Sequence, residues 1–229
     1  MRLWRFLIAF GFVLNVANVS LAQVKMELGA KAGLNYSSLN LSKDGKLNAT
    51  TLYHYAVGYH FGGYAVFKFA KYSIQPEVLY STQGHYFTTP YYSNLKTTLN
   101  YINIPVLLKY YLTGSLNVQI GPQLGLLVGS KGDLSQINGG YIVGSPIFNQ
   151  KLKDYVKSTD FSIALGAGIN FTPRVNVNVR YTIGINDINK NTGSTTPFPG
   201  GLQPSISTAY TRNQVFQVSV GYQLRKLGK

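Results

Sequence analysis

The sequence predicts an all-β protein, an eight-stranded antiparallel up-and-down transmembrane β-barrel with short periplasmic turns and long extracellular loops. Three observations predict this fold: eight segments in which apolar and polar residues alternate, connections that are alternately short and long, and glycines gathered on the polar face of the strands. Alternation with a period of two residues is the pattern of a strand with two different faces. Strands of this kind, joined by alternately short and long connections, form a meander that closes into a barrel.

The N-terminus has the features of a secretory signal peptide. Two arginines precede the apolar run at 6–14, and a small-residue cleavage site follows between Ala22 and Gln23. The apolar run is too short for an anchor helix, which needs roughly 20 residues. We therefore expect a signal peptide over residues 1–22 and a barrel domain over residues 23–229.

The first four predicted strands follow from the alternation alone. Residues 24–36 alternate without exception between apolar residues and polar or glycine residues. In 55–69, tyrosine, valine and phenylalanine alternate with histidine, glycine and lysine, and in 72–86 apolar residues alternate with serine, glutamine and glutamate. Residues 101–111 set isoleucine, valine and leucine against asparagine and lysine. β-Branched and aromatic residues of this kind favour strands.

The last four predicted strands show the same pattern. Residues 116–129 set leucine, valine and isoleucine against asparagine, glutamine and glycine, and 161–171 set phenylalanine, isoleucine and leucine against serine, glycine and asparagine. The cleanest alternation is in 175–186, where β-branched residues face asparagine, arginine and threonine. Residues 215–224 complete the set, so that the barrel has an even number of strands and both termini lie on the short-turn side.

The connections and the prolines add detail to this topology. Short turns are expected near 70–71, 113–115 and 172–173, and the longest loops near 130–159 and 188–212. Three prolines, Pro76, Pro105 and Pro122, fall inside predicted strands, although proline cannot donate a hydrogen bond to a ladder. Because a closed barrel has no free edge, we expect β-bulges and local changes of phase at these prolines.

Glycine and aromatic residues indicate which face of the strands is inside. Eleven strand glycines lie on the polar face, whereas two, Gly63 and Gly84, lie on the apolar face. The crowded interior of a narrow barrel needs such room for long side chains, and a water-exposed face does not. Aromatic residues of the apolar face gather near both strand ends, as at two membrane interfaces. We therefore expect an outer-membrane barrel of a Gram-negative-type bacterium with its apolar face in lipid, rather than a soluble lipocalin-like barrel.

The composition excludes several kinds of protein. The absence of cysteine excludes disulfides, a lipoprotein anchor and thiolate metal sites. Without the two N-terminal arginines, 19 basic residues remain against 7 acidic ones, a net charge of +12. These charges are scattered singly in an exported chain, so nucleic acid is not an expected partner. The expected partners are the lipid bilayer, anionic lipid of the outer leaflet and other envelope proteins.

Four segments resemble the PorT-like family of outer-membrane β-barrels. They are GAKAGLNYSSL at 29–39, PEVLYSTQG at 76–84, YINIPVLLKYYL at 101–112 and QIGPQLGLLVG at 119–129, in the family's order and spacing. The resemblance covers nearly the whole mature chain and implies an eight-stranded barrel in the outer membrane. The namesake of the family takes part in secretion across the outer membrane through a multiprotein machine, so the resemblance also suggests a secretion-related role.

The inward face of the predicted barrel carries one candidate site. Lys31, Tyr64, Glu77 and Arg180 lie at similar depths from the short-turn ends of their strands, and Lys109 also faces inward. We expect these residues to form a lumenal ion network around Glu77, with Arg180 as its bidentate partner. Such a network can act as a gate or a proton path, or it can fill the lumen and stabilise it. The narrow lumen of eight strands favours the second interpretation.

Other candidate sites are weaker. His54 and His85 are expected inside the outer mouth, but the sequence offers no third ligand beside them, so we assign no metal and no cofactor. No nucleophile motif is present, and we expect no enzyme. The long loops carry nine basic and five acidic residues, Asp160 among them, which suits the phosphates of outer-leaflet lipid.

These features leave three functions to consider. The favoured one is a small barrel with a structural or partner-binding role and a lumen filled by polar residues. The alternative is a narrow channel for small solutes or ions, made possible by the many lumenal glycines. A lipid-modifying enzyme is the least favoured.

Overall fold

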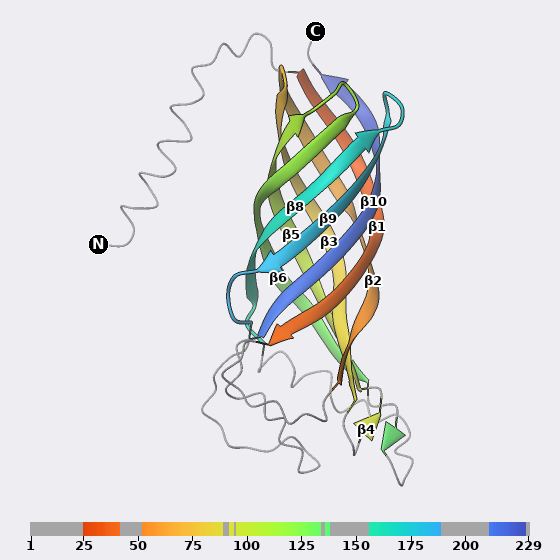
Figure 1. The fold of residues 1–229 in the computed structure, drawn as a ribbon, viewed down its shortest axis with the longest axis vertical. Coiled ribbons are helices and arrows are strands. Elements are labelled where there is room, and N and C mark those ends of the chain that lie inside the picture. Colours follow the sequence, from red (N-terminus) through yellow and green to blue (C-terminus); the bar gives the residue numbers. More distant parts are fainter. Residues whose placement is uncertain are drawn as a thin grey trace, which may run out of the picture.

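The computed structural model describes residues 25–41, 52–88, 92–93, 95–133, 136–137, 156–188 and 211–227. Eight long strands close into a barrel (Figure 1), which confirms the predicted fold class. They are β1 (Lys25–Leu41), β2 (Leu52–Phe69), β3 (Tyr72–Thr88), β5 (Leu95–Tyr111), β6 (Leu116–Asp133), β8 (Thr159–Asn170), β9 (Val175–Gly184) and β10 (Thr211–Leu227). The predicted signal peptide and its cleavage site lie outside the described residues.

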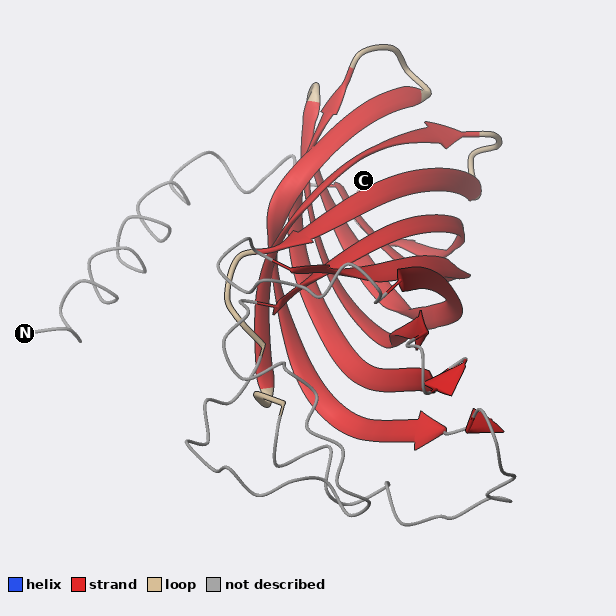
Figure 2. Ribbon diagram, turned by 60° about the horizontal axis from the view of Figure 1, so that its bottom comes forward, coloured by secondary structure: helices blue, strands red, loops and turns tan. Residues whose placement is uncertain are grey.

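Each strand pairs with its neighbours along the chain, and antiparallel pairing of β1 with β10 closes the barrel. The short β2–β3, β5–β6 and β8–β9 turns lie at one rim (Figures 1 and 2), together with the start of β1 and the end of β10. Two further strands that were not predicted, β4 (Tyr92–Ser93) and β7 (Gln136–Ile137), pair in a separate small sheet. Among the described residues, no helix is long and apolar enough to cross a membrane.

The outer surface of the barrel is apolar and its interior is mainly polar. Along β10, for example, Val215 and Gln217 are buried, whereas Phe216 and Val218, which alternate with them, are exposed. The same alternation exposes Leu34, at 63 %, and many other large apolar side chains of the wall. Such a wall suits lipid and not water, as the sequence predicts.

The prolines do not produce the expected bulges. Near Pro76, Pro105 and Pro122 the ladder to one neighbour is interrupted and then resumes in the same register. A missing N–H removes one hydrogen bond but adds no residue to the strand, so the two strands stay in phase. The register shifts of the barrel fall elsewhere, at Leu28/Gly29, Tyr55/His60 and Asn100/Tyr101.

The β2–β3 hairpin has a two-residue loop, since Phe69 pairs with Tyr72. The first residue of this loop, Ala70, has a φ of 46°. Tight hairpin loops need a positive φ, which glycine adopts far more readily than alanine. This turn is therefore formed at a cost in backbone energy.

Candidate functional site in the barrel lumen

Inward-facing glycines give the lumen room for long side chains from neighbouring strands. Gly29 of β1 lies directly opposite Tyr64 of β2, and a Cβ at Gly29 would collide with the Tyr64 ring. Gly33 lies opposite His60 in the same way. The glycine bias on the polar face therefore has a direct physical cause.

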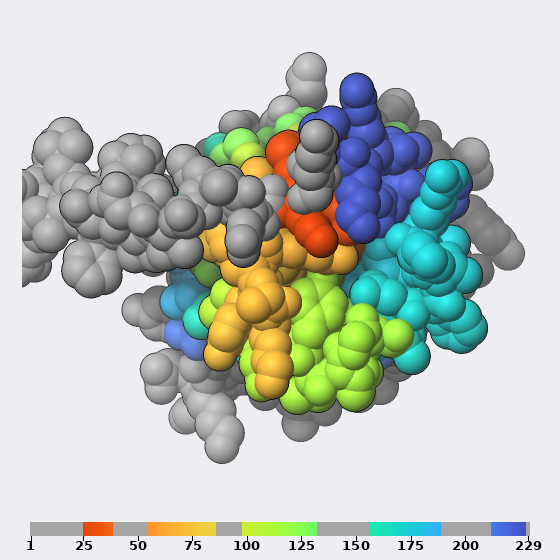
Figure 3. Space-filling view, turned by 90° about the horizontal axis from the view of Figure 1, so that it is seen from above, coloured from red at the N-terminus to blue at the C-terminus, as the bar shows by residue number. Residues whose placement is uncertain are grey.

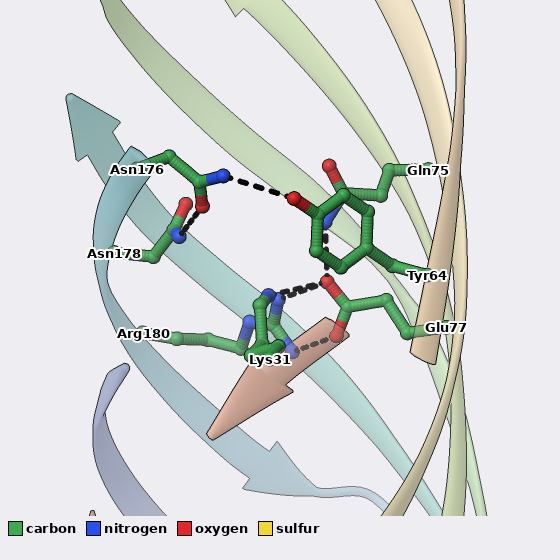
Figure 4. A network of polar contacts seen from close by, with 7 residues as sticks. All are labelled: Lys31, Tyr64, Gln75, Glu77, Asn176, Asn178 and Arg180. Atoms are coloured by element: carbon green, nitrogen blue, oxygen red, sulfur yellow. Dashed lines mark hydrogen bonds and ion pairs between the residues drawn. The ribbon is translucent and has the colours of Figure 1, made fainter. Parts of the chain in front are cut away.

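Glu77 lies at the centre of a buried ion network (Figure 4). Its carboxylate accepts a hydrogen bond from Lys31 Nζ at 2.6 Å and two from Arg180, from Nη1 at 3.0 Å and from Nη2 at 2.9 Å. Gln75 Nε2 donates a fourth at 2.6 Å. The side chains of Lys31, Glu77 and Arg180 are only 1 %, 0 % and 4 % exposed. Two cations thus share one carboxylate in a region that solvent does not reach.

Tyr64 contacts this network from the short-turn side. The Lys31 ammonium lies 5.8 Å from the centre of the Tyr64 ring, which is a cation–π distance. Asn176 Nδ2 donates to the Tyr64 hydroxyl at 3.1 Å, and Asn178 in turn donates to Asn176 at 2.7 Å. The structure thus brings four of the five predicted residues into one network that spans the lumen from β1, β2 and β3 to β9 (Figure 4).

Lys109, the fifth predicted residue, stands apart. It is buried, at 5 % exposure, and lies within electrostatic range of Glu77 and of three other cations. The ion pairs of Glu77 in the described barrel are with Lys31 and Arg180, however, and not with Lys109. In the strand register Lys109 lies opposite Ser73 on one side and Gln119 on the other.

A second polar layer, which the sequence did not predict, is built around Asn35. Asn35 Nδ2 donates to Ser81 Oγ at 3.0 Å and to two backbone carbonyls. Asn35 Oδ1 accepts from Gln217 Nε2 at 2.9 Å and lies 2.8 Å from His60 Nδ1. An asparagine in an alternating strand gives no signal that distinguishes it from any other inward polar residue.

An apolar cluster lies inside the barrel toward the long-loop end. Leu99, Tyr101 and Ile188 are each at most 2 % exposed, and Leu127 and Val156 pack against them. Asp160 lies beside this cluster, where Asn213 donates to Asp160 Oδ2 at 2.9 Å and to the Tyr101 hydroxyl at 3.4 Å. The assignment of Asp160 to an exposed loop was wrong, because β8 begins one residue before it and turns its side chain into the lumen.

The short-turn mouth is ringed mainly by cations. Glu27 pairs with Lys68 at 2.9 Å and with Lys226 at 4.0 Å, and Lys25 lies opposite Lys68 in the register. The ammonium of Lys68 also lies 5.8 Å from the Tyr111 ring centre. In the view onto this rim (Figure 3) the three turns lie next to one another, in orange, yellow-green and cyan.

The predicted histidine pair is only partly described. His85 is buried, whereas the side chain of His54 lies outside the described residues. Among the described side chains, no group of three or more histidines, cysteines or acids is placed to hold a metal ion.

Comparison with known proteins agrees with this architecture. The family described as outer membrane protein beta-barrel domain matches residues 21–190. The solved structure of Neisserial surface protein A (NspA) is similar, with 14 % identity and a TM-score of 0.50, over 86 % of this chain and 97 % of that one. At this identity the likeness shows the fold alone.

Two further solved structures align less closely. Ail of Yersinia pestis, solved with the heparin analogue sucrose octasulfate, has 12 % identity and a TM-score of 0.44, over 88 % of this chain and 99 % of that one. OprG of Pseudomonas aeruginosa has 13 % identity and a TM-score of 0.40, over 90 % and 96 % of the two chains. No match to a protein of curated function was found.

Proposed function

Because the chain belongs to the outer membrane protein beta-barrel domain family, we propose that it is a closed outer-membrane barrel that acts through surfaces outside its lumen. Its role is structural or partner-binding, with other proteins of the cell envelope as the partners. The observation that carries this proposal is the buried network around Glu77, whose side chains are at most 4 % exposed.

Three layers of side chains support a closed lumen. The Glu77 network crosses the middle of the barrel, and the Asn35 layer and the apolar cluster around Tyr101 lie between it and the long-loop end. An eight-stranded barrel is just wide enough for side chains to fill. The glycines that could widen a channel are covered by neighbours, as Gly29 is by Tyr64 and Gly33 by His60. The competing function, a narrow channel for small solutes or ions, has less support for this reason.

Planar-bilayer recording tests the closed lumen. The folded full-length protein should give no reproducible open level at any ionic strength. A steady unitary conductance from the pure protein would overturn the proposal and favour the channel. A porin recorded in the same bilayers shows that insertion and detection work.

The resemblance to the PorT-like family supports a finer version of the proposal, in which the envelope partner belongs to a secretion machine. Mass spectrometry of proteins that co-purify with the tagged chain from gently solubilised outer membranes tests it. A stoichiometric envelope protein, absent when an unrelated tagged barrel is purified in the same way, supports a partner-binding role. Recovery of the chain with lipid alone argues against one and leaves a purely structural role.

The proposal includes no catalytic step. The two histidines with described side chains, His60 and His85, are 2 % and 7 % exposed, so neither is presented to a lipid substrate. The surplus of basic residues in the long loops instead suits binding of phosphorylated lipid in the outer leaflet.

A further inference from the structure

The centre of the lumen carries more positive than negative charge. Besides His60 of the Asn35 layer, four described ionisable residues there are at most 5 % exposed: Lys31, Glu77, Lys109 and Arg180. Three are basic and one is acidic, so the cluster has a formal charge of +2. Burying charge without a counter-charge is costly, and protein interiors normally pair such groups or neutralise them.

Within this cluster Lys109 is the cation without an ion pair to a described residue, and its neighbours in the wall are polar. Ser73 of β3 and Gln119 of β6 lie directly opposite Lys109 in the two adjacent ladders, at 0 % and 3 % exposure. Side chains directly opposite each other in antiparallel strands lie on the same face, with their Cβ atoms about 5 Å apart. The three side chains therefore face the lumen as one row.

Several polar atoms in this row and in the nearby Arg180 have no hydrogen-bond partner among the described residues. These are Ser73 Oγ, both polar atoms of Gln119, and the Nε of Arg180. Gln119 reaches toward Arg180, because its Nε2 lies over Gly166, which pairs directly with Arg180 in the β8–β9 ladder. A hydroxyl, an amide N–H and a guanidinium N–H, each able to donate, thus lie along the same stretch of wall as the Lys109 ammonium, whereas the remaining unpaired atom, Gln119 Oε1, is an acceptor.

Unpaired polar side-chain atoms also lie elsewhere in the described lumen, for example on Thr82, Asn103 and Ser162. The row at Lys109 is distinguished by unpaired donors that lie beside a lysine without an ion pair to a described residue. Buried donors are almost always paired, with protein, water or a bound ion. Unpaired donors beside a surplus of positive charge point to an anion.

The rim nearest to this row is the short-turn rim, which carries further cations. Lys68 lies opposite Ser73 in the β2–β3 ladder, on the other side of Ser73 from Lys109, and its side chain is 33 % exposed. Lys25 and Lys226 add positive charge at the same mouth, near the carboxylate of Glu27. An excess of positive charge at such an entrance raises the local concentration of anions.

We infer that Lys109, Ser73 and Gln119 form a binding site for a small inorganic anion inside the lumen, reached from the short-turn mouth. The anion supplies the negative charge that the cluster around Glu77 lacks. The site is compatible with a closed lumen, because it lies on the short-turn side of the Asn35 layer and the apolar cluster.

Thermal unfolding of the full chain in detergent micelles tests the inference, with sodium gluconate replaced stepwise by sodium chloride, sulfate or phosphate at fixed ionic strength. The unfolding midpoint should rise with the anion that fits. Above the dissociation constant, each tenfold rise in its concentration should raise the ratio of folded to unfolded protein about tenfold. Chloride, sulfate and phosphate together distinguish a halide site from an oxyanion site. If none of the three raises the midpoint above its value in gluconate, the inference is wrong.

Two isosteric variants sharpen the test. Gln119→Glu places a carboxylate beside Lys109, so it should raise the midpoint in gluconate and abolish the response to the anion. Gln123→Glu is the matched control, since Gln123 lies on the same strand and face and is similarly buried at 5 %, but pairs with Pro105 and not with Lys109. Gln123→Glu should lower the midpoint and keep the response. An equal anion response in wild type and Gln119→Glu would overturn the inference.

A crystallographic experiment keeps the inference testable if a variant does not fold. Crystals of the wild-type protein soaked in bromide should show an anomalous peak within hydrogen-bonding distance of Lys109 Nζ if the site accepts halides, and a sulfate-grown crystal should show tetrahedral density there if it prefers oxyanions. Water alone at this position in both crystals contradicts the site.

Discussion

Replacement of Glu77 by alanine should lower the free energy of unfolding by about 3–5 kcal/mol. The carboxylate accepts hydrogen bonds from Lys31, Arg180 and Gln75, and its side chain is 0 % exposed. Removing it leaves two cations buried without a counter-charge, and that desolvation cost sets the size of the effect. A sum over four hydrogen bonds to a charged group, at about 1.5–3 kcal/mol each, would overshoot, because the four share one carboxylate and water can enter the space left behind.

Urea unfolding of the refolded protein in micelles measures this effect. Far-UV circular dichroism is the suitable probe, because the single tryptophan, Trp4, lies in the predicted signal peptide. Glu27→Ala is the matched control, since Glu27 also pairs with a lysine, but Lys68 is 33 % exposed there. We expect a cost of about 1 kcal/mol for that pair. If Glu77→Ala costs no more than Glu27→Ala, the central network does not stabilise the barrel.

Three further predictions use the same unfolding assay. Ala70→Gly should stabilise the protein by about 0.5–1 kcal/mol, because it relieves the positive φ of the β2–β3 loop and this gain exceeds the entropy cost of glycine; a loss of stability would show that the turn is not strained. Gly29→Val should cost about 1–3 kcal/mol, because its side chain collides with Tyr64, whereas Gly63→Val on the lipid face should be within about 0.5 kcal/mol of wild type. Asn35→Leu should cost about 2–4 kcal/mol, because it leaves several buried groups unpaired; a cost below that of Glu27→Ala would contradict the role of this layer.

The wall of the barrel could be predicted from the sequence because its signal is repeated in every strand. Alternation sets the face of each side chain, and the short turns at 70–71, 113–115 and 172–173 set the order of pairing. The prediction of bulges at the prolines was wrong. The sequence shows that a proline lacks an N–H donor, but it does not show which neighbouring strand loses the hydrogen bond or whether the register changes. In the structure, pairing with one neighbouring strand is interrupted at each proline and resumes in the same register.

The lumen could be predicted mainly where charge marked it. Lys31, Glu77 and Arg180 stand out as charges on the polar face, and their depth along the strands places them together. Tyr101 and Ile188 gave no such signal. Tyr101 lies in a strand that is apolar on both faces, so it does not differ from the lipid-facing residues beside it. Ile188 follows the end of an alternating segment, just before a long loop.

The same residues stabilise the barrel and close it, so stability and conductance have to be measured on the same variants. Glu77→Ala removes a charge and leaves space in the middle of the lumen. The triple variant Lys31→Met, Glu77→Leu and Arg180→Met removes the charges but keeps the volume. Since well-packed apolar groups often replace a buried ion network without loss of stability, we expect this variant to unfold near the wild-type midpoint and to stay closed. A variant that is as stable as wild type yet conducts would show that charge, and not volume, closes the lumen, and the function would then have to be sought in a gate rather than in the outer surfaces of the barrel.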